Sequence, residues 1–176
     1  MHEPAANPQP SDVTVWAGSW YGDAPMALDF PSGWKVTRCP PADGPAIDAA
    51  AVARALADPV GAPPLSEMVR GKRTAAIAVD DLTRPTPAHR FLPAVVDALR
   101  EAGLPAGGIR FVMGVAAHRP MTDEEVRQKL GADLADRFTV HVHDFMGPDV
   151  RKVGHVAGGP VYLNRHFLEA DLKVVV

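Results

Sequence analysis

Two short apolar runs, at residues 74–79 (TAAIAV) and 109–115 (IRFVMGV), are each followed by a polar loop and then by a helix-forming segment. A continuous apolar run of this length is typical of a strand that is covered on both faces of a sheet. Strands and helices that alternate in this way favour right-handed βαβ crossovers and a parallel sheet. We therefore expect an α/β fold built around a Rossmann-like parallel sheet.

The rest of the chain extends this plan. Further strands are expected at residues 138–142, 161–163 and 172–176, and helices at residues 47–57, 65–69, 88–102 and 123–130. Three β-like pieces precede them, at residues 13–17, 26–30 and 34–38. Pro31, Ser32 and Gly33 supply turn chemistry between the last two pieces, which predicts a small β meander. We take residues 1–12 as a disordered lead-in and residues 13–176 as one domain.

The composition of the chain indicates which binding partners and which cellular compartment to expect. The net charge of -3 and the pI near 6.1 predict no basic surface for nucleic acid or an anionic membrane. No apolar run is long enough to cross a bilayer, and residues 1–12 lack the apolar stretch of a secretory leader. The single cysteine, Cys39, allows no intrachain disulfide and favours a reducing compartment. These features predict a cytoplasmic protein in which Cys39 is either incidental, the interpretation we favour, or a reactive thiol.

The octapeptide DDLTRPTP lies between the first apolar run and a predicted helix. Thr86 is a suitable N-cap and Pro87 a suitable first helical residue, so free amides and the helix dipole would form an anion site. Arg84 adds a forked donor that fits phosphate or carboxylate, and Thr83 adds a hydroxyl. Asp81 could hold the arginine or accept a hydrogen bond from a ribose hydroxyl. The segment matches neither the glycine-rich dinucleotide motif nor the phosphate-loop motif. The alternative is a capped turn with a surface Asp–Arg pair.

The next loop, GVAAHRPMT, follows the second apolar run, and Thr122 with Glu125 predicts a capping box at the start of the helix after it. His118 suits proton transfer near neutral pH, and Arg119 could orient a substrate carboxylate. Loops that follow neighbouring parallel strands meet at the carboxyl edge of the sheet, where ligands bind in open α/β folds. We therefore predict that His118 is catalytic, against the alternative of a loop histidine with no role.

Two further histidines, His141 and His143, alternate along a predicted strand and therefore point to one face of it. They could hold a metal, but no cysteine or clear set of carboxylates nearby completes four ligands. A pair of structural histidines is the interpretation that we favour. We predict no metal ligand within this chain.

Together, DDLTRPTP and the pattern G-x-x-x-H-R-P-M-T resemble the nickel-dependent lactate racemase family. The resemblance extends to Tyr21-Gly22, to DPVG at residues 58–61 and to GPVYLNR at residues 159–165. It implies the N-terminal half of a two-domain α/β protein that is an isomerase, a racemase or epimerase of a 2-hydroxy acid. It also implies a nickel-pincer nucleotide as cofactor, a pyridinium mononucleotide that holds nickel through sulfur and carbon.

Carried onto this sequence, the resemblance places Asp81, Thr83 and Arg84 in the segment that grips the cofactor phosphate. It places His118 on one of two acid/base histidines, which removes the hydroxyl proton while the Cα hydride moves to the cofactor. In the family, the second histidine, a lysine that anchors the cofactor and a histidine on nickel follow the strand that matches residues 172–176. We therefore expect the missing C-terminal domain as a partner and expect this chain alone to be inactive.

Other functions fit the same residues. Ala116 and Ala117 stand where the family usually has Gly and Thr, so the 2-hydroxy acid need not be lactate. The chain could instead be a non-catalytic module that binds a nucleotide or a carboxylate. It could also be a different α/β enzyme that uses His118 and Arg119 for acid/base chemistry on a phosphorylated substrate. A domain that exposes its cleft face could also form a homo-oligomer.

Overall fold

The computed structural model describes residues 13–17, 24–39, 44 and 47–176. The chain divides into two units, Met1–Ala46 and Ile47–Val176. The predicted lead-in at residues 1–12 lies outside the described residues. In the described part of the chain, no helix combines the length and the apolar character needed to cross a bilayer.

In the first unit, strands β1 (Val13–Ala17) and β2 (Ala24–Leu28) form an antiparallel pair. β2 begins two residues earlier than the predicted strand at residues 26–30. The strand predicted at residues 34–38 is wrong, because this segment has no regular secondary structure. Its first residue, Trp34, closes a turn with its amide and is 63% exposed, so the apolar residues do not mark a covered face. The predicted meander is therefore a strand pair.

The second unit is built around a parallel sheet of four strands in the order β5-β4-β3-β8. Its strands are β3 (Ala75–Asp80), β4 (Ile109–Gly114), β5 (Thr139–Val142) and β8 (Leu172–Val175). The α/β prediction is confirmed, and the predicted bounds of these strands differ from the observed ones by at most one residue. Because β3 and β4 are central, the loops that follow them leave the middle of the carboxyl edge.

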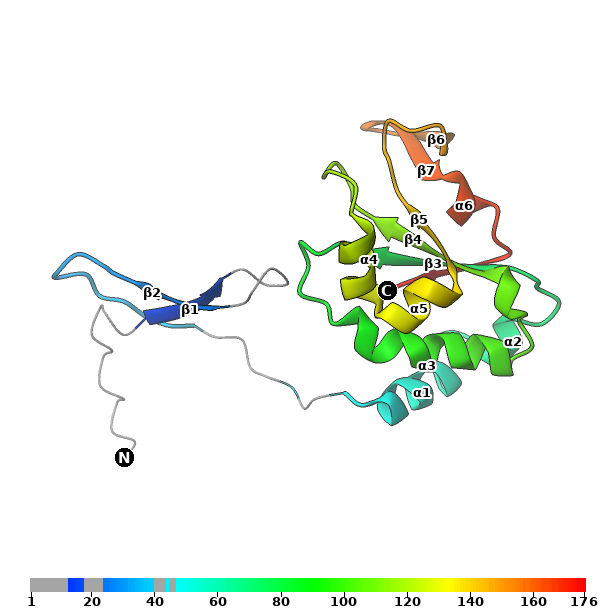
Figure 1. The fold of residues 1–176 in the computed structure, drawn as a ribbon, viewed down its shortest axis with the longest axis horizontal. Helices are drawn as coiled ribbons and strands as arrows, with labels where there is room; N and C mark the ends of the chain where they lie inside the picture. The colour runs from blue at the N-terminus through cyan, green and yellow to red at the C-terminus, as the bar shows by residue number, and fades with distance from the viewer. Residues whose placement is uncertain (1–12, 18–23, 40–43, 45–46) are drawn as a thin grey trace. The chain divides into compact units, whose positions relative to one another are not determined.

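Helices cover one face of this sheet (Figure 1). They are α1 (Ala49–Ala57), α2 (Leu65–Met68), α3 (Ala88–Glu101), α4 (Asp123–Leu130) and α5 (Ala132–Arg137). α3 buries Leu92, Val95, Val96 and Leu99, which recur at the spacing of one helical face. These residues share a core with alternate residues of β3 and β4, and α1 packs mainly against α3.

The opposite face of the sheet carries a smaller core. Ala76 of β3 and Val112 of β4 are buried there against Ala170 and the half-buried Phe167. Phe167 belongs to the short helix α6 (Arg165–Leu168), which precedes β8. The sheet is thus covered on both faces, as its continuous apolar strands require.

A second antiparallel pair, β6 (Val150–Val156) and β7 (Gly159–Asn164), lies between β5 and α6 in the chain. The strand predicted at residues 161–163 lies in β7, and its assignment to the parallel sheet is wrong. A short apolar run does not reveal its pairing partner, which is why the two cases could not be separated. β6 was not predicted, because its residues other than Val150 are exposed and include several that are charged or polar.

Candidate active site

The loops that follow β3 and β4 leave the same edge of the sheet (Figure 1). β3 and β4 are parallel neighbours whose last residues, Asp80 and Gly114, are paired in register. The first loop, residues 81–87, leads into α3, and the second, residues 115–122, leads into α4. The two segments predicted to carry function therefore meet at the edge where open α/β sheets bind ligands.

Asp81 in the first loop and His118 in the second are in direct contact. The Nδ1 atom of His118 lies 2.6 Å from Oδ2 of Asp81. The Asp81 side chain is 7% exposed, whereas the His118 side chain is 45% exposed. A buried carboxylate thus holds one nitrogen of a ring that stays accessible to a ligand.

The surroundings of Asp81 keep its carboxylate charged. Burial by itself raises the pKa of Asp81, but hydrogen bonds from His118 and Thr83 outweigh burial and hold the pKa below its usual value. An ionised carboxylate only accepts hydrogen bonds, so the 2.6 Å contact requires the proton on Nδ1 of His118. Nε2 of the neutral ring then carries the lone pair, which is the arrangement of a general base.

Thr83 and Arg84 stand at the exposed tip of the first loop. Oδ1 of Asp81 accepts hydrogen bonds from both the amide and the hydroxyl of Thr83, which closes an Asx-type turn. The Arg84 guanidinium donates to the Thr83 hydroxyl oxygen at 3.3 Å, and the Arg84 amide donates to the Asp81 carbonyl at 3.2 Å. The loop therefore presents a guanidinium and a hydroxyl beside the Asp81–His118 pair.

The start of α3 differs from the prediction. The N-cap is Pro87 rather than Thr86, and no side chain caps the helix. The Thr86 hydroxyl donates instead to Oδ2 of Asp80 at 2.7 Å. The amides of Ala88 and Arg90 donate to the carbonyls of Thr86 and Pro87, so neither is available to an anion. The exposed side chains of the loop are therefore better candidates for contact with an anion than these two amides.

A buried lysine fixes the first loop from behind. Lys129 in α4 has no exposed surface, and its Nζ atom donates to the carbonyls of Arg84 at 3.0 Å and Thr86 at 3.1 Å. The same atom lies 2.7 Å from Oδ1 of Asp80. The sequence prediction missed this residue. The available signal was a lysine at a position that helical spacing assigns to the buried face of α4.

The guanidinium of Arg119 is held by Glu125 rather than presented alone. Its Nη1 and Nη2 atoms lie 2.8 Å and 2.6 Å from the two carboxylate oxygens of Glu125. Glu125 also accepts from the Thr122 amide, and the Thr122 hydroxyl accepts from the Glu125 amide, which confirms the predicted capping box. A substrate carboxylate would compete with Glu125, so the geometry favours a role for Arg119 in holding the His118 loop.

Known proteins match the part of the chain that contains both loops. The family model described as "Lactate racemase N-terminal domain" matches residues 21–176. The chain belongs to this lactate racemase family. Curated lactate racemases from Lactiplantibacillus plantarum and Thermoanaerobacterium thermosaccharolyticum are 33% and 32% identical to it over 125 residues. Those residues are 70% of this chain and 29% of each relative, so the chain spans less than a third of their length.

A solved lactate racemase structure agrees with this assignment, and a second solved structure shows the same fold. The lactate racemase apoprotein from T. thermosaccharolyticum matches with a TM-score of 0.67 and 26% identity, over 93% of this chain and 38% of that one. A crystal structure of a Thermotoga maritima protein shares the fold, with a TM-score of 0.54 and 23% identity over 73% of this chain and 33% of that one. The chain therefore corresponds to an N-terminal part of longer lactate racemases.

In this lactate racemase domain, the predicted histidine pair belongs to the outer strand β5 and its end. The ring of His141 stacks on His166 of α6, with 3.5 Å between ring centroids and 5° between planes. His143 Nδ1 lies 3.3 Å from the side-chain nitrogen of Asn164. Across residues 13–17, 24–39, 44 and 47–176, no three His, Cys, Asp or Glu side chains group as metal ligands. The pair thus contacts β7 and α6.

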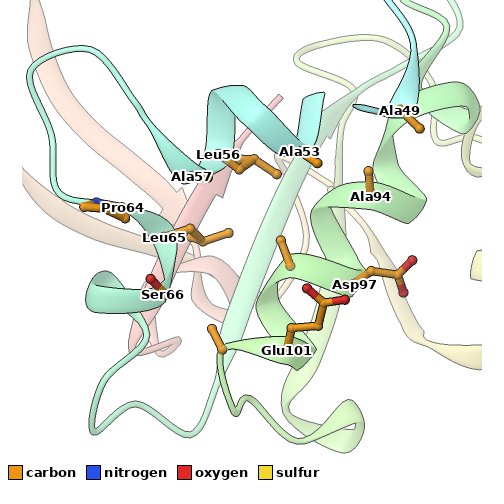
Figure 2. Close-up of a pocket in the computed structure, with 12 residues that line it drawn as sticks. Ala49, Ala53, Leu56, Ala57, Pro64, Leu65, Ser66, Ala94, Asp97 and Glu101 are labelled. Carbon is orange, nitrogen blue, oxygen red and sulfur yellow. The ribbon is translucent and has the colours of Figure 1, made fainter. Parts of the chain in front are cut away.

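A pocket of about 620 Å³ opens between α1, α2 and α3 (Figure 2). Its walls are largely apolar and include Leu56, Leu65 and Ala94, and its charged lining residues are Asp97 and Glu101. These two acids belong to the second half of α3, whereas the first loop enters the start of that helix. The pocket therefore contains no residue of the candidate active site of the lactate racemase domain.

Proposed function

We propose that this chain supplies the N-terminal part of a racemase or epimerase of a 2-hydroxy acid, in which His118 is an acid/base residue. The observation that carries the proposal is the 2.6 Å contact between Asp81 and His118 in a chain of the lactate racemase family. Inversion by removal and return of hydrogen at a hydroxyl-bearing carbon also requires the hydroxyl proton to leave and return. A histidine held in one tautomer by a buried carboxylate is suited to that transfer.

In the proposed reaction, Nε2 of His118 takes the hydroxyl proton as the Cα–H bond breaks. Asp81 stabilises the resulting imidazolium, because its ionised carboxylate accepts the proton on Nδ1 of His118. The oxygen regains a proton when the Cα–H bond re-forms on the other face, where the family resemblance implies that the second acid/base histidine serves. Asp81 and His118 end each turnover in their starting protonation states, as an isomerisation requires.

The family implies a nickel-pincer nucleotide, which when bound supplies the acceptor for the hydride from Cα. In this chain, the exposed guanidinium of Arg84 has the chemistry to contact its phosphate, and Thr83 supports this role because its hydroxyl oxygen accepts a hydrogen bond from that guanidinium. Asp81 contributes indirectly, because it holds the amide and hydroxyl of Thr83. The fit that we propose for these residues is to the phosphate of the cofactor. We assign the nickel ligands and the second acid/base histidine to the remaining part of the protein.

The test is chiral analysis of a panel of 2-hydroxy acids, incubated with the protein extended to the length of its curated relatives and loaded with the cofactor. Inversion of at least one acid is expected. The 176-residue chain alone is the control and should invert none of them. Binding of phosphate ligands by the extended protein without inversion of any acid would favour the non-catalytic binding module instead.

A further inference from the structure

We infer that Lys129 is a positioning residue that sets the contact between Asp81 and His118 by fixing the backbone of the first loop. The inference rests on the proposed function of that pair. No role was assigned to Lys129 from the sequence, and its ammonium group contacts the Arg84 and Thr86 carbonyls and the Asp80 carboxylate, all in the first loop or the residue before it. Its effect on the reaction would therefore pass through the loop.

A lysine without exposed surface is unusual, because burial of an ammonium group is costly unless the group is paired and hydrogen-bonded. Lys129 meets this condition with three oxygens within 3.1 Å of Nζ: the carbonyls of Arg84 and Thr86 and the carboxylate of Asp80. The two carbonyls accept hydrogen bonds from the ammonium group, and the Asp80 carboxylate is its ion-pair partner. All three oxygens belong to the segment that contains Asp81.

The positions of these acceptors explain how Lys129 can act on Asp81. Asp80 lies directly before Asp81, and Arg84 and Thr86 lie after it, so the loop is held on both sides of the carboxylate. The Arg84 amide also donates to the Asp81 carbonyl, so Arg84, whose own carbonyl is bound by Lys129, is hydrogen-bonded directly to Asp81. Hydrogen bonds weaken steeply when their geometry departs from linear. A shift of the loop would therefore weaken the 2.6 Å contact with His118.

The same helix holds the second loop. Glu125 lies one turn before Lys129 on the buried face of α4, and its carboxylate binds the guanidinium of Arg119, the neighbour of His118. Lys129 holds the loop of Asp81 and Glu125 holds the loop of His118. α4 thus acts as a rigid link that fixes the spacing of the two loops.

The test is the tautomer of His118, read from the 15N chemical shifts of its ring in the 176-residue chain. The unmodified chain is expected to carry the proton on Nδ1. Lys129→Met keeps a side chain of similar length but removes the donors, and is expected to shift His118 toward the Nε2-protonated form. Asp81→Asn supplies the reference for a lost contact. Lys173→Met is the matched control, because the Lys173 ammonium donates to the Ala170 carbonyl near the amino edge of the sheet.

Loss of Lys129 leaves the Asp80 carboxylate without its ion pair, which destabilises a partly buried charge. Where circular dichroism shows that Lys129→Met is unfolded, the double variant Asp80→Asn/Lys129→Met takes its place, with the same expected shift. An unchanged Nδ1 tautomer in a folded variant overturns the inference and leaves the proposed function standing. A ring protonated on Nε2 in the unmodified chain overturns both, since there would be no Asp81–His118 contact to position.

Discussion

The Nδ1 atom of His118 and the Oδ2 atom of Asp81 lie 2.6 Å apart, although 37 positions separate the two residues in the chain. The parallel strands β3 and β4 bring them together, because both strands end in register at one edge of the sheet. The carboxylate is buried and the ring is not. The pair therefore combines a buried carboxylate with an imidazole ring that is exposed to solvent.

Replacement of Asp81 tests how much the orientation and tautomer of His118 contribute to the reaction, because His118 itself is retained. Asp81→Asn keeps the size of the side chain but removes the charge that selects the Nδ1-protonated ring. In the extended, cofactor-loaded protein, kcat for inversion is expected to fall by roughly 10²- to 10⁴-fold. Asp171→Asn is the control, because Asp171 binds the amides of Arg73 and Thr74 at the amino edge of the sheet. An Asp81→Asn variant with unchanged kcat would remove Asp81 from the mechanism.

Arg84→Ala should weaken retention of the cofactor. The substitution removes the exposed guanidinium that we assign to the phosphate, and a hydrogen bond to a charged group contributes about 1.5–3 kcal/mol. Nickel content after dialysis measures the loss of cofactor from the variant. The dissociation constant of the cofactor is expected to rise by about 10- to 100-fold. Arg100→Ala, at the other end of α3, should retain the cofactor as the unmodified protein does. Equal nickel content in both variants would count against the phosphate role.

Acidification should destabilise the second unit through His141. Burial lowers the pKa of His141, and the charges of His166, Arg110 and Arg165 lower it further, against the opposing charge of Asp149. The unfolded chain binds this proton near pH 6.5 and the folded chain only at lower pH, so stability declines as pH falls below 6.5. The urea midpoint should therefore fall on acidification. His141→Phe, which keeps a flat ring against His166, should reduce that fall; an unaltered pH dependence would show that His141 is not its source.

Two neighbouring glycines in the short 3-10 helix η3 (Ala106–Gly108) should respond differently to alanine. A Cβ atom at Gly108 would lie 2.1 Å from the carbonyl oxygen of Arg73, whereas one at Gly107 would meet no atom within 4 Å. Gly108→Ala is expected to lower the free energy of unfolding by about 1–3 kcal/mol. Gly107→Ala should change it by less than about 0.5 kcal/mol. Urea unfolding of both variants checks this, and equal losses would contradict the packing described at Gly108.

The parallel sheet was predictable because its strands are continuous apolar runs and because α4 carries a clear start signal, the Thr122–Glu125 capping box. The β6–β7 pair was not, because pairing depends on contacts that a run such as residues 161–163 does not encode. The prediction of a third strand in the meander was wrong because Trp34 is exposed and follows a turn, so its apolar side chain does not mark a buried face. Local pattern thus identified the strands of the parallel sheet, but neither the exposed strand β6 nor the sheet to which β7 belongs.

The sequence nominated residues for the candidate site but did not predict the contacts between them. Parallel strands place Asp81 and His118 at one edge, yet side-chain orientation decides that they bind each other. Lys129 was missed because a pattern of polar and apolar residues assigns lysine to the solvent-exposed surface. Such a pattern does not show that three oxygen atoms of the first loop and the residue before it lie within reach of its ammonium group. The contact between Arg119 and Glu125 was not predicted either, because Glu125 was assigned only to the capping box.

The most direct measurement is turnover of a single enantiomer of each 2-hydroxy acid by the extended, cofactor-loaded protein carrying His118→Gln. The matched control is His155→Gln, the same substitution at an exposed residue of β6. At equal nickel content, His118→Gln is expected to lower kcat for inversion by at least ~10²-fold, and His155→Gln to leave it unchanged. Inversion by His118→Gln at the rate of the unmodified protein would contradict the assignment of His118 as the residue that transfers the hydroxyl proton.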